Sequence, residues 1–435
     1  MVTVASAGLS LREAGRLVVA VDHVALLLLT MEAFLPLWYA MSGRTVDPAA
    51  GDLLTRTWLL VGYVAVVPII VRRAPRAFRA LAQEPVLLLL LLWAFASILW
   101  SSEPGVTARR WAGACLPLLY ALALTLRFDG RALLRLIGWP LLVAVAGSLA
   151  MVVAMPDWGI MGYPHEGAWR GMFVKKNVLG RYAALAVFLF PTLASLDRRH
   201  MSVFWIASSL LSAVVLLGSR SLSSIMLTIA GICIWLFLRI ASPLHRFWLL
   251  LSAIFMIAAM IAVVAIGHNY ESAVGRGPTL TGRIPLWLLL LEMARERMWL
   301  RYGYGAFWIR LEGPSAYVWV ALGWAVPHAH NGYLDLLLEI GVIGLSLGVF
   351  LLCTSVAQLL AAYGREPSPE VVCWLTVVAF LIGYNMVESG FLRSNSFLWI
   401  LLLLALFTSQ RLSVRDTDKA VAQGRQETIS LVVHR

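Results

Sequence analysis

The stretch PHAHNGYLDLLLEIGVIGL, from Pro327 to Leu345, begins with two histidines and an asparagine and then becomes apolar. The apolar run continues to about residue 360. It is therefore longer than the about 20 residues that a helix needs to cross the hydrocarbon core of a bilayer. The stretch predicts a membrane-spanning helix over residues 331–360, with polar residues gathered at its start.

The rest of the chain has the same apolar character. Of its 435 residues, 60% are hydrophobic and 13% are charged, and the mean hydropathy is +0.82. These values exclude an ordinary soluble domain. They predict an all-α, polytopic membrane protein with a single transmembrane domain, residues 1–415, and a polar cytoplasmic tail, residues 416–435. About twelve transmembrane helices are expected, near 18–41, 57–71, 86–100, 112–126, 134–155, 178–196, 201–217, 222–238, 247–267, 331–360, 371–388 and 394–410.

Arginine-rich loops follow the even-numbered segments, and both ends of the chain are basic. Because Lys and Arg are enriched in cytoplasmic loops, these loops and both termini are predicted to be cytoplasmic. The odd-numbered loops then face outward, and two of them are long, residues 156–177 and 268–330. The second contains RIPLWLLLLEMARERMWL, residues 283–300, which predicts a short helix at the membrane surface or capping the bundle.

Positive residues also recur on the predicted outer side, where the same rule leads us to expect few. A single one is explained by contact with a lipid headgroup or a surface ion pair. Several on one membrane face favour a polyanionic ligand such as a lipid phosphate or pyrophosphate, because the planar guanidinium can donate two hydrogen bonds at once. Arg220, in a very short turn between two apolar segments, must face a polar cavity or the interface. The outward cations are Arg109, Arg110, Arg170, Lys175, Lys176, Arg220, Arg283 and Arg301.

His330 is predicted to lie at the start of the tenth transmembrane helix, after a turn at Pro327 and beside Asn331, which suits an N-cap. The positive end of the helix dipole disfavours protonation of a nearby imidazole. His330 can therefore act as a base, or it can be an interface histidine that only satisfies its own hydrogen bonds. The pattern alone leaves both interpretations open.

Two acidic residues follow within the apolar run. Asp335 and Glu339 are four residues apart and share one face of the helix. They are expected either to pair with arginines of other helices or to act directly in the site. Beyond them, Gly341, Gly344 and Gly348 are expected to allow close helix packing.

A zinc site is a different interpretation of His328 and His330. An H-x-H pair together with Asp335 could supply ligands, but no third ligand has a persuasive spacing and the HExxH motif is absent. The four cysteines lack metal-ligand spacing as well. We therefore expect no metal.

Six phrases, taken in their order, resemble the O-antigen ligase and polymerase superfamily. The resemblance spans most of the chain from Arg170 to Trp399, and its first and last phrases look closer to exopolysaccharide polymerases of the succinoglycan type. The phrases are RGMFVKKNVLG (170–180), GSRS (218–221), TGRIPLW (281–287), GYGAFW (303–308), HAHNGYLDLLLEIGVIG (328–344) and NMVESGFLRSNSFLW (385–399).

The resemblance implies a metal-independent glycosyltransferase of the GT-C type, without a cofactor, in the bacterial inner membrane. Its donor is a glycan linked to polyprenyl (undecaprenyl) pyrophosphate on the periplasmic side. A polymerase transfers the glycan to the sugar end of another lipid-linked unit, and a ligase transfers it to a lipid A–core sugar. The shared motifs do not separate these two activities. Attack opposite the departing pyrophosphate inverts the anomeric centre.

The resemblance also implies roles for single residues. His330 is expected to be the general base, with His328 second. Arg170, Arg220 and Arg283, with Lys176 and Arg301 behind them, are expected to bind the pyrophosphate and offset its charge as it leaves. The supporting residues are expected to be Asn177, Asn331, Asp335, Glu339 and Glu388.

Two other classes of protein compete with an enzyme. A transporter or flippase for anionic lipid-linked substrates also needs arginines within the membrane, but it favours broken helices and a site near the midplane. The polar phrases here lie at the outer ends of the predicted helices. A membrane scaffold leaves the outward arginines unexplained.

Overall fold

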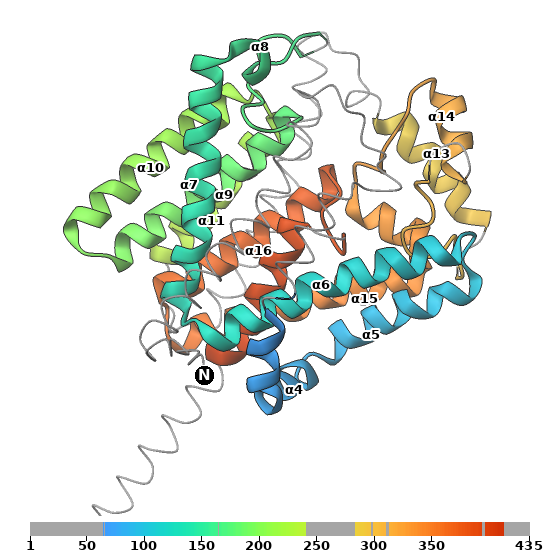
Figure 1. The fold of residues 1–435 in the computed structure, drawn as a ribbon, viewed down its shortest axis with the longest axis horizontal. Helices are drawn as coiled ribbons and strands as arrows, with labels where there is room; N and C mark the ends of the chain where they lie inside the picture. Colours follow the sequence, from blue (N-terminus) through green and yellow to red (C-terminus); the bar gives the residue numbers. More distant parts are fainter. Residues whose placement is uncertain are drawn as a thin grey trace, which may run out of the picture.

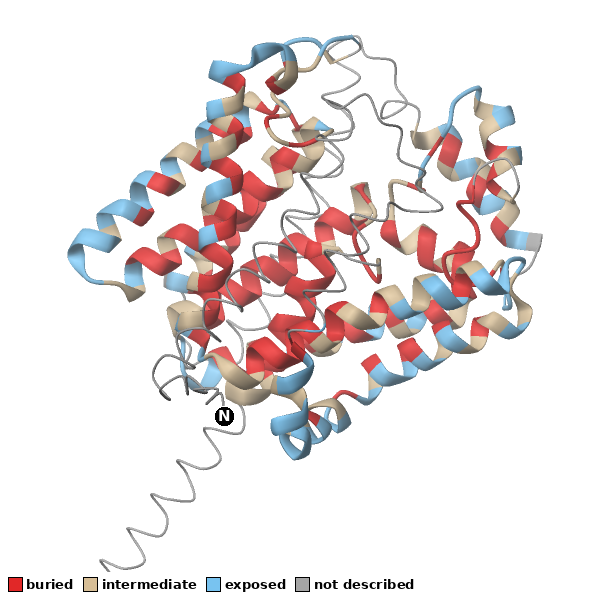
Figure 2. Ribbon diagram, in the orientation of Figure 1, coloured by how far each residue is buried: buried red, intermediate tan, exposed pale blue. Residues whose placement is uncertain are grey.

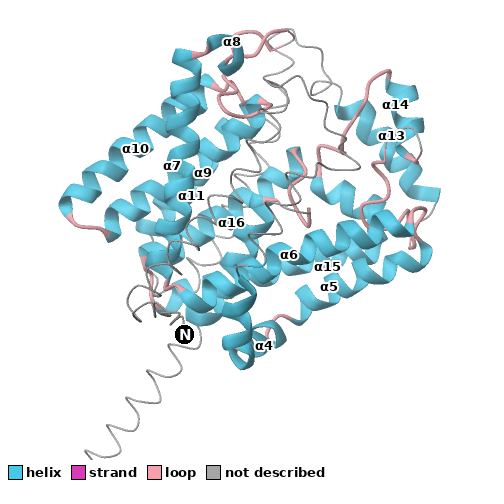
Figure 3. Cartoon of the chain, in the orientation of Figure 1, coloured by secondary structure: helices cyan, strands magenta, loops and turns pink. Residues whose placement is uncertain are grey.

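The computed structural model describes residues 64, 66–163, 165–240, 283–296, 299–309, 313–393 and 396–412. Within these ranges the regular elements are helices, apart from an isolated bridge between Ile160 and Trp169 (Figure 3). The predicted all-α class is confirmed. The predicted segments 18–41 and 247–267, most of 57–71, and the tail 416–435 lie outside the described residues.

Six helices in the described ranges are long and apolar enough to cross a membrane. A pair of shorter helices, bent by 87° at a break, brings this number to seven if the pair counts as one span. The expected count of about twelve is not shown by the described part of the chain. The six helices are α7 (Gly130–Ala154), α9 (Lys176–Leu196), α10 (Arg199–Gly218), α11 (Leu222–Ile240), α15 (Gly332–Arg365) and α16 (Pro369–Val387).

The second to fourth predicted segments differ most from the structure. The expected basic loop after residue 71 contains helix α4 (Ala74–Ala82), and α5 (Pro85–Ala96) with the turn η1 (Ser97–Trp100) follows at 87° to it. The bend falls just before Pro85, which occupies the first turn of α5, where a missing backbone N–H costs no hydrogen bond. Helix α6 (Pro104–Arg127) begins eight residues before the predicted 112–126, again at a proline.

Helices α9 and α16 form the centre of the bundle. Their apolar windows are 72% and 78% buried, against 28% for α10 and 33% for α11. Helix α16 contacts α9, α11 and α15, and α15 in turn contacts α5 (Figure 1). Burial is accordingly densest along α9 and α16, whereas α10 exposes much of its surface (Figure 2). In a membrane protein this contrast separates helices enclosed by protein from helices that face lipid.

The arginine-rich loops meet at one end of the bundle. Arg73 donates to Leu126 O at 2.6 Å, and Arg411, at the end of helix Phe397–Leu412, donates to backbone carbonyls of Thr125 and Phe128. At the same end Arg131 and Arg135 pair with Asp197. The loops predicted to share one side of the membrane are therefore neighbours in space.

The other end of the bundle is covered by the predicted outer segments. Two short helices, α13 (Arg283–Glu296) and α14 (Ser315–Leu322), lie here. The expectation of short helices in the long loop before the histidine helix is confirmed. Leu286 and Leu290 of α13 pack with Val326, Ala329 and other buried apolar residues in a small core of their own. This small core holds the segment before α15 in place.

Helix α15 begins as predicted and is broken near its start. Asn331 is the N-cap, and its side chain accepts from the backbone N–H of Tyr333 and Leu334 at 3.0 and 3.1 Å. Gly341, however, is non-helical, with φ 73° and ψ −172°. This is a conformation that glycine alone adopts readily. Gly341 is buried and interrupts the helix, a role that the sequence did not predict, while its expected role in close packing stays a prediction.

Candidate active site

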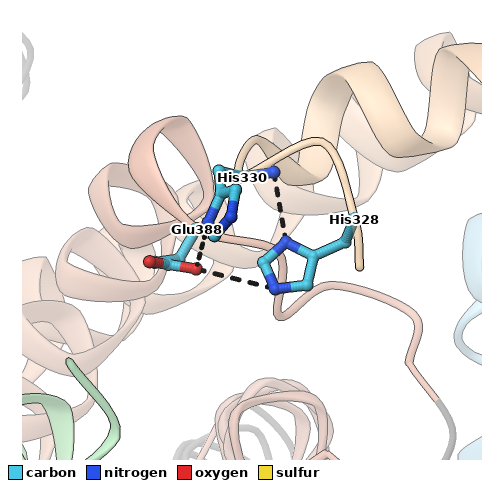
Figure 4. A group of neighbouring side chains, drawn as sticks. All are labelled: His328, His330 and Glu388. Atoms are coloured by element: carbon cyan, nitrogen blue, oxygen red, sulfur yellow. Dashed lines mark hydrogen bonds and ion pairs between the residues drawn. The ribbon is translucent and has the colours of Figure 1, made fainter. Parts of the chain in front are cut away.

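A histidine and a glutamate from distant parts of the chain meet at the end of the bundle that carries α13 and α14. Nδ1 of His330 lies 3.1 Å from Oε2 of Glu388 (Figure 4). His330 directly precedes the N-cap of α15, and its φ of +50° turns the ring out of the helix path. Glu388 is the C-cap of α16, and 8% of it is exposed. The pair therefore forms where α15 begins and α16 ends.

Glu388 is the centre of the cluster. Its Oε1 accepts from Nη2 of Arg283 and from Nδ2 of Asn177, each at 3.0 Å. Burial alone would raise the pKa of Glu388, but the hydrogen bond with His330 and the positive charge of Arg283 outweigh burial and hold the pKa well below its usual value. Glu388 is therefore a carboxylate that joins the first turns of α9 and α13 to the histidine segment.

His328 has a different environment from His330. Its Nδ1 accepts from the backbone N–H of His330 at 3.1 Å, and its Nε2 lies 3.9 Å from Oε2 of Glu388. Burial lowers the pKa of His328 to about 3. A neutral ring that accepts at Nδ1 carries its proton on Nε2. The only basic lone pair of the neutral His328 ring is thus already occupied at Nδ1, which leaves His328 poorly suited to take up a further proton.

Asn177 is held in one orientation by Ser221, which belongs to the GSRS phrase, residues 218–221. Its Oδ1 accepts from Oγ of Ser221 at 3.2 Å, and Ser221 also bonds to Ser224 at 3.0 Å. The amide therefore directs Nδ2 at Glu388. The first turns of α9 and α11 approach closely here, because a Cβ on Gly180 would come within 3.0 Å of Ser221 and Ser224. Sequence reasoning missed Ser221, although it belongs to the quoted GSRS phrase.

Three of the predicted cations bond to backbone carbonyls: Arg170 and Arg220 in loops, and Lys176 at the start of α9. Nζ of Lys176 donates to Arg220 O at 3.1 Å, and Arg220 donates through Nη1 to Glu166 O at 3.1 Å. Arg170 donates through Nε to Trp158 O at 2.6 Å. A carbonyl fixes a cationic side chain without cancelling its charge. These bonds therefore hold positive charge beside the cluster around Glu388.

Arg301 lies elsewhere. Its side chain is buried, with 2% exposed, and its Nη1 is 3.5 Å from Met293 O near the end of α13. Within the described ranges it makes no contact with Glu388 or either histidine. The structure therefore brings Arg283 to the carboxylate and leaves Arg301 apart. Lys176 and Arg220 are the chain neighbours of Asn177 and Ser221, whereas Arg170 bonds to Trp158 O.

Asp335 connects the histidine segment to two residues outside it, Trp308 and Arg393. Its Oδ1 accepts from Nε1 of Trp308 at 2.7 Å and from the backbone N–H of Ala329 at 3.1 Å, and its Oδ2 pairs with Arg393. Ala329 lies between the two histidines, so this carboxylate fixes their position. Of the two expectations for Asp335, pairing with an arginine from another segment is the one that the structure shows. Sequence reasoning did not single out Arg393, although it lies in the same quoted phrase as Glu388.

Glu339 is also buried, one turn further along α15. The charges of Arg393 and Arg110 both act on its carboxylate, and the backbone N–H of Gly305 donates to it. Glu339 therefore lies near two positive charges, one turn beyond Asp335 along α15. The two expectations for Glu339, pairing and a direct role, both stay predictions.

The cluster also contains a set of atoms that could hold a metal ion. One ligand atom each from His328, His330 and Glu388 lie within 4.8 Å of one another. The sequence showed no third ligand because Glu388 follows His330 by 58 residues. Arg283, however, is bound to the same carboxylate at 3.0 Å. Its fixed positive charge already compensates Glu388 and would repel a cation placed beside it.

Two comparisons with known proteins bear on this cluster. Residues 207–349 match the O-antigen ligase family, and this range includes Arg220, Arg283 and both histidines. The resemblance to the O-antigen ligase family is confirmed. The chain is also 28% identical over 322 residues to the exopolysaccharide production protein ExoQ of Rhizobium meliloti (strain 1021), which covers 68% of this chain and 72% of that protein. Members of the O-antigen ligase family are glycosyltransferases, and the matched range contains Arg283 and both histidines of the cluster.

Proposed function

We propose that this protein is a glycosyltransferase that moves a glycan from an undecaprenyl-pyrophosphate donor to a sugar hydroxyl, in exopolysaccharide or O-antigen polymerisation. The observation that carries the proposal is the contact of His330 with Glu388, beside Arg283. The O-antigen ligase family match and the similarity to ExoQ support this class of reaction. The proposed site is periplasmic, because the arginine-rich loops gather at the opposite end of the bundle.

His330 is the proposed general base. A sugar hydroxyl is a weak nucleophile near neutral pH, and a positioned base accelerates its attack by about 10²–10⁴-fold. When Nδ1–H of His330 donates to Oε2 of Glu388, the lone pair of Nε2 is left to accept the hydroxyl proton. The buried carboxylate then stabilises the imidazolium that forms. His328 lacks this arrangement, because its Nδ1 already accepts from the backbone.

The proposed role of the cations is to stabilise the negative charge of the departing pyrophosphate. As the acceptor oxygen bonds to the anomeric carbon, the bond to the pyrophosphate oxygen breaks and the electron pair leaves with the pyrophosphate. Positive side chains already in place lower the energy of this charge without reorganising. Arg170, Lys176 and Arg220, held by carbonyls, and Arg283 on Glu388 are the proposed partners. Attack from the opposite side inverts the anomeric centre, and no metal takes part.

A direct assay tests the reaction. The purified full-length protein in lipid nanodiscs is given lipid-linked glycan extracted from the source bacterium, together with an acceptor, and the products are analysed for a new glycosidic bond and released lipid pyrophosphate. Both are expected. Movement of lipid-linked glycan across the bilayer without bond formation would instead identify a transporter.

A ligase remains the second candidate, because the matching family is described as O-antigen ligase. A strain that lacks the gene separates the two activities. Lost exopolysaccharide with intact lipopolysaccharide is the result expected for a polymerase. Bare lipid A–core with accumulated lipid-linked polymer would identify a ligase.

A further inference from the structure

Tryptophans surround the histidine segment, and most of them hold it in place. The indole N–H of Trp287 donates to Ala329 O at 2.8 Å, and that of Trp319 donates to Val326 O at 2.7 Å. A third, Trp308, donates to Asp335 at 2.7 Å. Each of these side chains packs inward and satisfies a polar group of the loop or of α15. They account for the rigidity of the segment that carries His330.

Trp324 lies in the same loop and is arranged differently. It follows Gly323, whose φ of +71° ends α14, and 42% of it is exposed. Its indole N–H forms no hydrogen bond with any of the described residues. Its ring centroid is 6.4 Å from that of His330, with 33° between the two planes. A large flat apolar surface is thus fixed beside the proposed base and is left uncovered.

We propose that Trp324 is a platform on which the acceptor sugar stacks, and the proposal rests on the function proposed above. One face of a pyranose ring presents C–H groups, which pack against an aromatic ring at about 3.5–4.0 Å between carbon atoms. The hydroxyls of such a ring project from its edge. The separation of the Trp324 and His330 rings is close to the width of one monosaccharide, so a sugar on the indole face has a hydroxyl within reach of the imidazole.

The rigid mounting of Trp324 strengthens the argument. The Trp319 to Val326 bond closes the loop around Trp324, and the Trp287 to Ala329 bond fixes the segment that follows it. A preorganised platform places the hydroxyl near the base without an entropic cost at each turnover. An aromatic residue that only anchors the protein at the membrane interface needs neither this rigidity nor the position beside His330.

The test uses the full-length protein in nanodiscs, with extracted lipid-linked glycan as donor and the soluble oligosaccharide repeat, released from the same polysaccharide, as acceptor. Trp324→Ala is expected to raise the KM for the oligosaccharide about tenfold, equivalent to about 1.4 kcal/mol. The KM for the donor and kcat are expected to change by less than about threefold. Trp299→Ala is the matched control, because Trp299 is 62% exposed in a different segment.

Two more variants separate stacking from simple apolar contact. Trp324→Phe keeps a flat face and should retain most of the acceptor affinity, whereas Trp324→Leu keeps apolar bulk without a face and should resemble Trp324→Ala. An unchanged acceptor KM, equal effects of Phe and Leu, or a rise in the donor KM alone would each overturn the inference while the proposed function stands. A wild-type protein that forms no glycosidic bond would overturn both.

Discussion

Glu388 lies 3.1 Å from the imidazole of His330 although 58 positions separate them in the chain. The contact exists because α15 starts where α16 ends, so that a residue before one helix meets the residue after the other. The proposed base and the proposed cation at the leaving group therefore depend on the same carboxylate. The same carboxylate that contacts the proposed base also binds Arg283, the proposed partner of the leaving group.

The first prediction concerns this pair. His330→Ala is expected to lower the rate of glycosidic bond formation by about 10²–10⁴-fold, because the base is removed. Glu388→Gln is expected to lower it by about 10–100-fold, because the imidazole stays but its orientation and tautomer are no longer fixed, as for other groups that orient a histidine. Initial rates with lipid-linked donor provide the measurement. Equal losses from His328→Ala and His330→Ala would contradict the assignment of the base.

The second prediction uses the left-handed backbone of Arg220, whose φ is +48°. Arg220→Gly relieves a conformation that costs a non-glycine residue about 1 kcal/mol, so the melting temperature should stay the same or rise. The KM for the donor should increase, because a phosphate partner is lost. Arg220→Lys should keep more of the donor affinity. Thermal unfolding and donor titrations on the same preparations separate stability from function, and an unchanged donor KM in Arg220→Gly would exclude a role in donor binding.

The third prediction addresses the pair of buried Asp335 and partly exposed Arg393. Asp335→Asn keeps an oxygen for the Ala329 N–H but removes the carboxylate that Arg393 contacts, which is expected to destabilise the protein by about 1–3 kcal/mol. The double variant Asp335→Asn/Arg393→Gln should lose less free energy of unfolding than the two single variants lose together, because the pair is lost only once. Thermal unfolding of the four proteins in one detergent measures this. Additive losses would show that the two side chains do not stabilise each other.

The fourth prediction concerns metal. Activity should survive excess EDTA followed by dialysis, because Arg283 already supplies positive charge to Glu388. The rate before and after chelation is the measurement. Activity that disappears and returns with one divalent cation would assign His328, His330 and Glu388 as its ligands instead.

The fifth prediction follows from the burial of His328. An unfolded histidine binds a proton below about pH 6.5, whereas the folded pKa of His328 is about 3. Between these values the unfolded state holds more protons, so the free energy of unfolding decreases as the pH falls, by at most about 1.4 kcal/mol per pH unit. The low pKa of Glu388 acts in the same direction below about pH 4.5.

Thermal unfolding of His328→Gln between about pH 7 and 5 is the corresponding experiment. Its melting temperature should depend less steeply on pH than that of the wild type. The matched control is His200→Gln, because His200 is exposed. This variant should show the same dependence of the melting temperature on pH as the wild type. A wild-type melting temperature that rises on acidification would contradict the predicted sign.

Much of the fold follows from hydropathy alone. The predicted 134–155 and 371–388 correspond to α7 (Gly130–Ala154) and α16 (Pro369–Val387), because a bilayer demands long apolar runs and the chain supplies them. The 87° bend before Pro85 was not predicted. Hydropathy averaged over a window of residues shows where an apolar helix lies, but it says nothing about the angle between two consecutive helices.

The sequence singled out several residues of the cluster but none of its contacts. The motif phrases contain His330, Arg283, Asn177 and Glu388, yet no spacing rule relates positions that come together only through the packing of α9, α13, α15 and α16. Arg301 was expected among the outward cations that bind pyrophosphate, whereas its side chain is buried with Nη1 3.5 Å from Met293 O.

The interruption at Gly341 leaves two backbone carbonyls of α15 without their usual partners within the helix, and other segments supply the donors. Glu339 O accepts from Gly303 N at 3.0 Å, and Ile340 O accepts from Nε1 of Trp93 at 2.9 Å. The short part of α15 that follows His330 is thus fastened to the outer loop and to α5. We expect a tilt of the long part beyond Gly341, caused by a change in bilayer thickness, to be taken up at this joint. The imidazole would then keep its position in membranes of different lipid composition.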